Sequence, residues 1–264
     1  MQPHRPRKRF GQHFLHDRQV IERLVRAIAP KPQQPLLEIG PGEGVLTRPL
    51  LATGARVTVV ELDRDLAASL AERLGRPEAL EIVQGDILKV DLTALAGAQR
   101  LRVVGNLPYN ISTPILFHLF EHLPMLVDMH FMLQKEVVDR LVAEPGGRDY
   151  GRLSVMAGFF CEMDWLFDVP PEAFRPAPKV TSAIIRLRPK ALGESDRALL
   201  PALDQVVRQA FGQRRKTLRN SLRTLLDEQA IEAAGVDPGT RPERLSLPEF
   251  LVLARLLPSA VAKD

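Results

Sequence analysis

The sequence predicts an α/β protein in which a mostly parallel sheet is covered by helices and is followed by a smaller, all-helical domain. Short apolar runs recur along the first 190 residues, and segments with helical spacing separate them. After Arg188-Pro189-Lys190 the strand-like runs stop and only helical patterns remain. We therefore expect a sheet domain over residues 1–190 and a helical domain over residues 191–264.

The elements of the sheet domain follow from periodicity and end signals. Asp17 can cap a helix that carries apolar residues on one face and ends at Pro30. Apolar or β-branched runs then predict strands at Leu36–Ile39, Val57–Glu61, Leu80–Val83, Leu101–Val104 and Val127–Leu133. Helical spacing lies between or after them at Leu66–Leu74, Pro114–His122 and Val137–Ala143. Helices between strands favour parallel pairing.

The rest of the chain changes in pattern. Trp165–Val169 and Ala183–Leu187 lie close together in sequence and predict an antiparallel addition to the sheet. Gly146-Gly147 marks an exposed loop. Beyond residue 190, helices are expected over Leu199–Phe211, Thr217–Leu226 and Leu247–Leu257.

Composition narrows the class of protein. The chain has 264 residues, 45% of them hydrophobic, which suits one large domain or a medium domain plus a smaller one. Its one cysteine, Cys161, excludes an internal disulfide, and no His/Cys cluster has zinc-ligand spacing, so we expect a reducing compartment and no metal. No apolar run is long enough to span a membrane, so a soluble, cytoplasmic protein is expected.

A glycine-rich loop follows the first predicted strand and opens a helix. In Glu38-Ile39-Gly40-Pro41-Gly42-Glu43-Gly44 the glycines let the backbone turn tightly and approach a ligand, as in Rossmann-like sheets. The third glycine comes one position too early for the dinucleotide fingerprint, and two acids would repel a pyrophosphate. Acids suit the cationic sulfonium and ammonium groups of S-adenosyl-L-methionine, which we therefore expect as the cofactor.

Two more acids stand at predicted strand ends. Glu61 follows the loop by about twenty residues, where a carboxylate can accept from both ribose hydroxyls. Asp86 ends the third strand and could accept from the adenine amino group of the cofactor. Taken singly, a helix cap or a surface charge explains each acid better than a ligand role does.

The turn Asn106-Leu107-Pro108-Tyr109 is the most informative stretch. The Asn106 side-chain oxygen and the Leu107 carbonyl can accept both hydrogens of an exocyclic amine, Pro108 stiffens the turn, and Tyr109 can stack on the base. Such a site favours the pyramidal nitrogen that forms when the N6 of adenine is methylated. The alternative is a proline turn in which Asn106 caps a helix beginning near Ser112.

Basic residues cluster in the second domain. Between Asp204 and Asp227 there are six of them and no acid: Arg208, Arg214, Arg215, Lys216, Arg219 and Arg223. On a helix, Arg215, Arg219 and Arg223 would form a stripe opposite Leu218, Leu222 and Leu225. A stripe of one sign favours RNA phosphates over the alternative of a solvated face. A basic N-terminal arm, Arg5–Arg9, is a second candidate patch.

Taken together, these motifs resemble the ribosomal RNA adenine dimethyltransferase family, nearly from end to end. The resemblance rests on the glycine loop and on six further segments: Lys8–Leu15, Val60–Asp63, Gly105–Ser112, Met132–Val137, Phe174–Val180 and Phe211–Thr217. Among its members, the chain is most similar to those that dimethylate two adjacent adenosines near the 3′ end of 16S ribosomal RNA. The resemblance implies a 16S rRNA or 30S precursor substrate, and we expect a monomer.

The resemblance also implies site residues. The cofactor would be contacted by His13, Leu15, Gly40, Gly42, Glu61, Asp86 and Asn106. The catalytic turn Asn106, Leu107, Pro108 and Tyr109 would receive the base, with Phe174 as a second aromatic wall unless Phe174 simply packs in the core. The family often has Asn where His13 stands; as an alternative, His13 is a surface residue of the basic arm.

Three rival functions stay open on the sequence. A large-subunit RNA methyltransferase of the antibiotic-resistance type would share the loop and the turn. A non-catalytic RNA-binding or assembly factor could keep the fold, although the intact glycine loop, Glu61 and Asn106 speak against it. A nicotinamide oxidoreductase is disfavoured by the glycine spacing and the loop acids.

Overall fold

The computed structural model describes residues 12–213 and 215–258, and the chain divides into two compact units. One unit contains Met1–Val138 and Met163–Pro189, and the other contains Asp139–Glu162 and Lys190–Asp264. Residues 139–162 were expected in the sheet domain but belong with the C-terminal unit. Helix α7 (Arg152–Phe160) explains this division, because its mostly buried apolar residues pack against helices of that unit. The functional roles assigned to two domains stay a prediction.

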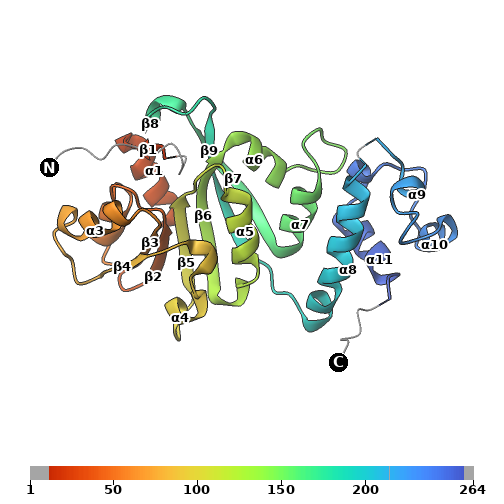
Figure 1. The fold of residues 1–264 in the computed structure, drawn as a ribbon, viewed down its shortest axis with the longest axis horizontal. Helices are drawn as coiled ribbons and strands as arrows, with labels where there is room; N and C mark the ends of the chain where they lie inside the picture. Colours follow the sequence, from red (N-terminus) through yellow and green to blue (C-terminus); the bar gives the residue numbers. More distant parts are fainter. Residues whose placement is uncertain (1–11, 214, 259–264) are drawn as a thin grey trace. The chain divides into compact units, whose positions relative to one another are not determined.

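The first unit is built on a seven-stranded sheet with the strand order β4-β3-β2-β5-β6-β9-β7 (Figure 1). Strands β2 to β6 pair in parallel, and β9 pairs antiparallel to β6. In chain order the strands are β2 (Pro35–Ile39), β3 (Arg56–Glu61), β4 (Leu80–Gln84), β5 (Leu101–Asn106), β6 (Leu126–Gln134), β7 (Cys161–Val169) and β9 (Ser182–Pro189). The predicted α/β class and the antiparallel addition are confirmed.

The central strands carry apolar side chains on both faces, and both faces are buried. Leu36 and Leu37 of β2 are at most 1% exposed although they point to opposite faces. One face packs against α1, which Asp17 caps by accepting from the backbone N–H groups of Gln19 and Val20. The helices and 3-10 turns of this unit are α1 (Arg18–Ile28), α2 (Thr47–Ala52), α3 (Arg64–Arg73), η2 (Ile87–Lys89), α4 (Leu92–Ala96), α5 (Ser112–Phe120), η3 (Leu123–Met125), the first part of α6 (Lys135–Leu141) and η4 (Pro171–Ala173).

A small two-stranded sheet joins the start of the described chain to a distant segment. Strand β1 (Phe14–Leu15) pairs antiparallel with β8 (Phe174–Arg175). The His13 Nδ1 atom lies 2.7 Å from the Pro176 carbonyl oxygen, so the ring donates there when Nδ1 is protonated. Two-residue strands leave no periodicity to detect, and the sequence analysis did not predict them.

The second unit is helical, but one of its predicted helices is wrong in extent. Its elements are α7, α8 (Glu194–Phe211), α9 (Leu218–Ser221), α10 (Glu228–Ala233), η5 (Pro242–Arg244) and α11 (Leu247–Arg255). The predicted helix Thr217–Leu226 is reduced to α9. Within this segment Asn220 Nδ2 donates to Thr217 Oγ1 at 3.0 Å. Within the described residues, no helix is long and apolar enough to cross a membrane.

Candidate active site

A cavity of about 310 Å³ opens at the carboxyl ends of the parallel strands. Its wall contains every residue assigned to the cofactor and all four residues of the catalytic turn: His13, Leu15, Gly40, Gly42, Glu61, Asp86, Asn106, Leu107, Pro108 and Tyr109. These residues come from five separate stretches of sequence. The fold therefore brings the two predicted half-sites, for cofactor and for base, into one cavity.

Phe174 is the exception. Its ring is 2% exposed and packs in the hydrophobic core, and it is not among the described residues that line the cavity. This placement matches the alternative of core packing. A role as the second aromatic wall would require the ring to leave the core, and it stays a prediction.

The glycine loop forms a cradle that side chains would fill. Gly40 and Gly42 have φ angles of 67° and 56°, in the left-handed region that favours glycine. A Cβ atom on Gly42 would lie 3.1 Å from the Phe14 ring. The loop is held by its own N–H groups, because Gly40 N donates to the Val60 carbonyl at 2.9 Å and Gly42 N donates to Glu61 Oε2 at 3.1 Å. A ligand can thus approach the backbone closely here.

Two buried carboxyl groups make the cavity attractive to a cation. Burial raises the pKa of Glu38 to about 7, and the nearby Glu61 carboxylate adds to the rise. One oxygen of Glu38, Oε2, has no hydrogen-bond partner among the residues that the structure describes. Burial also raises the pKa of Glu61, although the backbone N–H groups of Asp63 and Gly42 act in the opposite direction. A bound positive charge would relieve both groups.

Glu61 and Asp86 line the cavity wall and also accept hydrogen bonds from nearby backbone N–H groups. Glu61 accepts from Gly42 N through Oε2 and from Asp63 N, at 2.9 Å, through Oε1. Asp86 caps η2 by accepting from Leu88 N at 3.1 Å. Asp86 therefore caps a helical turn, as the alternative states, and still lines the cavity.

Asn106 is oriented by the N-terminal segment. Its Nδ2 atom donates to the His13 carbonyl at 3.0 Å, and the Oδ1 atom has no donor among the described residues. The alternative in which Asn106 caps the following helix does not hold, because α5 begins after Ile111 and no side chain caps it. Leu107 N donates to the Met132 carbonyl at 3.2 Å, which ties the turn to β6. The arrangement leaves an amide oxygen that can accept from a ligand.

Tyr109 is held by two residues from distant segments. Its hydroxyl lies 2.6 Å from Ser182 Oγ at the start of β9, and its ring stacks on His13 with centroids 5.5 Å apart at an angle of 22°. Burial raises the pKa of Tyr109, so its hydroxyl stays protonated at neutral pH. Ser182 was not predicted as a site residue; it is a fully buried polar residue, and its only signal in the sequence is a hydroxyl at the edge of an apolar strand.

The basic cluster differs from the predicted stripe. Arg208 forms an ion pair with Asp204, and Arg219 forms one with Glu228 at 3.2 Å, so acids just outside the window neutralise both. Because α9 spans four residues, Arg215 and Arg223 do not share one helix face. The basic residues that remain exposed without an ion pair to a described residue are Arg215, Lys216 and Arg223. Arg214 and the arm Arg5–Arg9 lie outside the described residues.

The sheet, the glycine cradle, the acid-lined cavity and the amide-proline-aromatic turn define a Rossmann-like methyltransferase that uses S-adenosylmethionine. The family model described as "Ribosomal RNA adenine dimethylase" matches residues 3–258. The chain belongs to this family, and its substrate is ribosomal RNA.

Similar proteins agree in name and in fold. The "Ribosomal RNA small subunit methyltransferase A" of Methylococcus capsulatus is 57% identical, over 96% of this chain and 98% of the relative. The protein of the same name from Pseudomonas aeruginosa is 56% identical, over 96% and 95%. A dimethyladenosine transferase from Plasmodium falciparum superposes with a TM-score of 0.76 at 27% identity, over 91% of this chain and 96% of that chain. The 23S rRNA methyltransferase ErmE gives 0.71 at 32% identity, over 92% and 99%.

Proposed function

We propose that this enzyme dimethylates the N6 atoms of two adjacent adenosines in 16S ribosomal RNA, on a precursor of the small ribosomal subunit. Two relatives that are named for the small subunit and are 56–57% identical over nearly the whole chain support this target. The observation that carries the chemistry is the orientation of Asn106, whose amide nitrogen is engaged by the His13 carbonyl. The oxygen of that amide is thereby left for the amine of the base.

The adenine amine is a poor nucleophile because its lone pair is delocalised into the ring. Asn106 Oδ1 and the Leu107 carbonyl would each accept one N–H, which favours the pyramidal nitrogen of the transition state over the flat ground state. Tyr109, fixed by Ser182 and His13, would stack on the base and hold it in line. When bound, S-adenosylmethionine would supply an electrophilic methyl group to this nitrogen, and its sulfur would keep the electron pair of the broken bond.

The chain's acids hold the positive charge before reaction. Glu38 and Glu61 would face the cationic cofactor, and their carboxylates are stabilised by it. No strong general base is needed, because the methylated nitrogen becomes acidic and can release its proton to water. In the second transfer to each base only one N–H is left, so a single acceptor of the turn is used.

RNA binding is assigned to the second unit. Arg215, Lys216 and Arg223, with Arg214, are the best candidates to contact phosphates, and Arg208 and Arg219 would first have to leave their acid partners. We also propose that the enzyme acts as a monomer in the cytoplasm, where its free, buried Cys161 stays reduced.

The test is methylation of small ribosomal subunits that lack dimethyladenosine. The protein and a methyl-labelled cofactor are added, and the RNA is digested and mapped by mass spectrometry. Two adjacent dimethyladenosines near the 3′ end of 16S RNA are expected. Methylation of large-subunit RNA instead would replace the proposed target with the rival activity that the likeness to ErmE raises.

Two variants of Asn106 test the mechanism. Asn106→Ala removes the acceptor and should lower kcat by about 100-fold or more, the effect typical of losing one transition-state hydrogen bond. Asn106→Asp keeps an accepting oxygen and loses the donor to the His13 carbonyl, so it should retain more activity than Asn106→Ala. Equal activity of wild type and Asn106→Ala would contradict the mechanism even where methylation occurs.

A further inference from the structure

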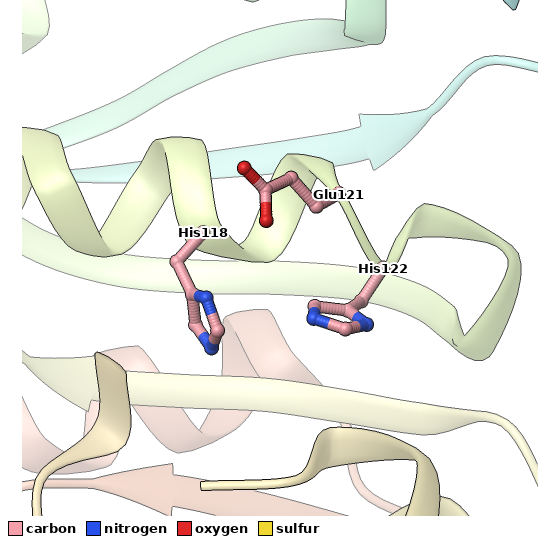
Figure 2. A group of neighbouring side chains, drawn as sticks. All are labelled: His118, Glu121 and His122. Atoms are coloured by element: carbon pink, nitrogen blue, oxygen red, sulfur yellow. The ribbon is translucent and has the colours of Figure 1, made fainter. Parts of the chain in front are cut away.

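Three side chains that can bind a metal gather at the end of α5, outside the cavity described above. His118 lies in the last turn of the helix, Glu121 ends it, and His122 precedes η3. Figure 2 shows the two imidazole rings projecting from the same side of this segment, with the Glu121 carboxylate on the turn between them. One ligand atom from each residue lies within 4.8 Å of the other two.

The spacing places these groups together for a physical reason. His118 lies in the last turn of α5, and the chain turns back just after the helix, where His122 N donates to the Leu119 carbonyl at 3.0 Å, so His122 stays beside His118. Their ring centroids are 5.2 Å apart at an angle of 70°, an edge-on arrangement. Glu121 is exposed and can swing its carboxylate toward the two rings. The prediction of no metal rested on His/Cys clusters alone, whereas this group combines two histidines with a glutamate.

An orphaned nitrogen supports a ligand at this place. The His118 Nε2 atom is buried and has no hydrogen-bond partner among the residues that the structure describes. A buried ring nitrogen without a partner is unfavourable, and coordination of the ring would fix its tautomer and orientation.

We propose that His118, Glu121 and His122 form a binding site for a divalent transition-metal cation, with Zn²⁺ as the first candidate. Two imidazoles and one carboxylate suit Zn²⁺, whereas Mg²⁺ and Ca²⁺ prefer oxygen ligands throughout. Zinc bonds of about 2.0–2.2 Å require ligand atoms closer than those of the present side chains, and rotations about the side-chain bonds provide this. Water completes the coordination.

The site is separate from methyl transfer. None of its three residues lines the cavity, and α5 separates them from the turn Asn106–Tyr109. A bound cation would instead join the end of α5 to the start of η3. Because it binds the folded chain, it should raise the unfolding temperature.

The experiment is a titration of untagged, full-length protein that has been stripped of metal with a chelator. Calorimetry with Zn²⁺ should give one equivalent of tight binding, and Co²⁺ should give the visible absorption bands of a site with few ligands. His122→Gln should weaken binding by about 100-fold or more and Glu121→Gln by about tenfold, since the loss of groups around a metal weakens binding at least this strongly. His16→Gln, which removes an exposed imidazole elsewhere, should leave binding unchanged.

Thermal unfolding gives a second readout for variants whose folding is in question. Zn²⁺ should raise the unfolding temperature of wild type and His16→Gln but not that of His122→Gln, while methyl transfer stays unchanged in His122→Gln. Equal affinity for Zn²⁺ in wild type and His122→Gln would overturn the proposal. So would the absence of tight binding by wild type.

Discussion

The pKa of Glu38 leads to a quantitative prediction about stability and pH. Burial raises the pKa of this carboxyl from an ordinary value of 4.5 to about 7 in the folded protein. Between these two values the folded chain holds a proton that the unfolded chain has released. The free energy of unfolding therefore falls as pH rises through this window, by about 1.4 kcal/mol per pH unit, and levels off above pH 7.

Glu38→Gln removes this dependence while keeping the shape of the side chain. Between pH 5.5 and pH 8 wild type should lose about 2 kcal/mol relative to the variant, from about 1.5 pH units of the window. The variant should accordingly be the more stable protein at pH 8 when no cofactor is present. Because the ionised carboxylate attracts the sulfonium cofactor, Glu38→Gln should also bind S-adenosylmethionine more weakly at pH 8.

The assay is urea unfolding of both proteins at the two pH values, followed by calorimetry with the cofactor. A stability difference between wild type and Glu38→Gln that does not change with pH would refute the argument, since it would mean that Glu38 titrates near its ordinary value. Glu43→Gln is a matched control, because Glu43 also lines the cavity but pairs with Arg73 at 3.2 Å. Because this variant retains Glu38, its free energy of unfolding should fall with pH as that of wild type does.

Four more substitutions have expected outcomes. Ser182→Ala leaves the Tyr109 hydroxyl without its partner and should lower kcat/KM about five- to tenfold, as a lost hydrogen bond of about 1 kcal/mol does; single-turnover methylation would measure it. Asp17→Ala removes the cap of α1 and should lower the free energy of unfolding by about 1 kcal/mol in urea titrations. Arg223→Ala should weaken RNA binding and reduce its salt slope by about 1, measured by filter binding at several salt concentrations. Arg219→Ala, whose guanidinium is paired, should have the smaller effect.

The sheet could be predicted from sequence because burial leaves a direct trace there. Strands covered on both faces must be apolar at successive positions, as in Leu36 and Leu37. The end of α1 is also marked in the sequence, by Pro30. The predicted stripe of free basic residues was wrong because ion pairs leave no such trace in the sequence. Whether Arg208 or Arg219 is free depends on acids one helical turn or more away in sequence, Asp204 and Glu228, which a count over the window left out.

Ten residues predicted for the cofactor and the base line one cavity, but the geometry of the site could not be predicted, because its orienting contacts join segments far apart in sequence. The His13 carbonyl holds the Asn106 amide, the His13 ring stacks on Tyr109, and Ser182 holds the Tyr109 hydroxyl. No local pattern encodes such contacts, since His13 and Asn106 are 93 residues apart in sequence and Tyr109 and Ser182 are 73 residues apart. Four adjacent residues supply the chemical groups of the turn, whereas residues from distant segments hold these groups in place. This is why substitutions at Ser182 should affect the reaction although Ser182 is not among the residues that line the cavity.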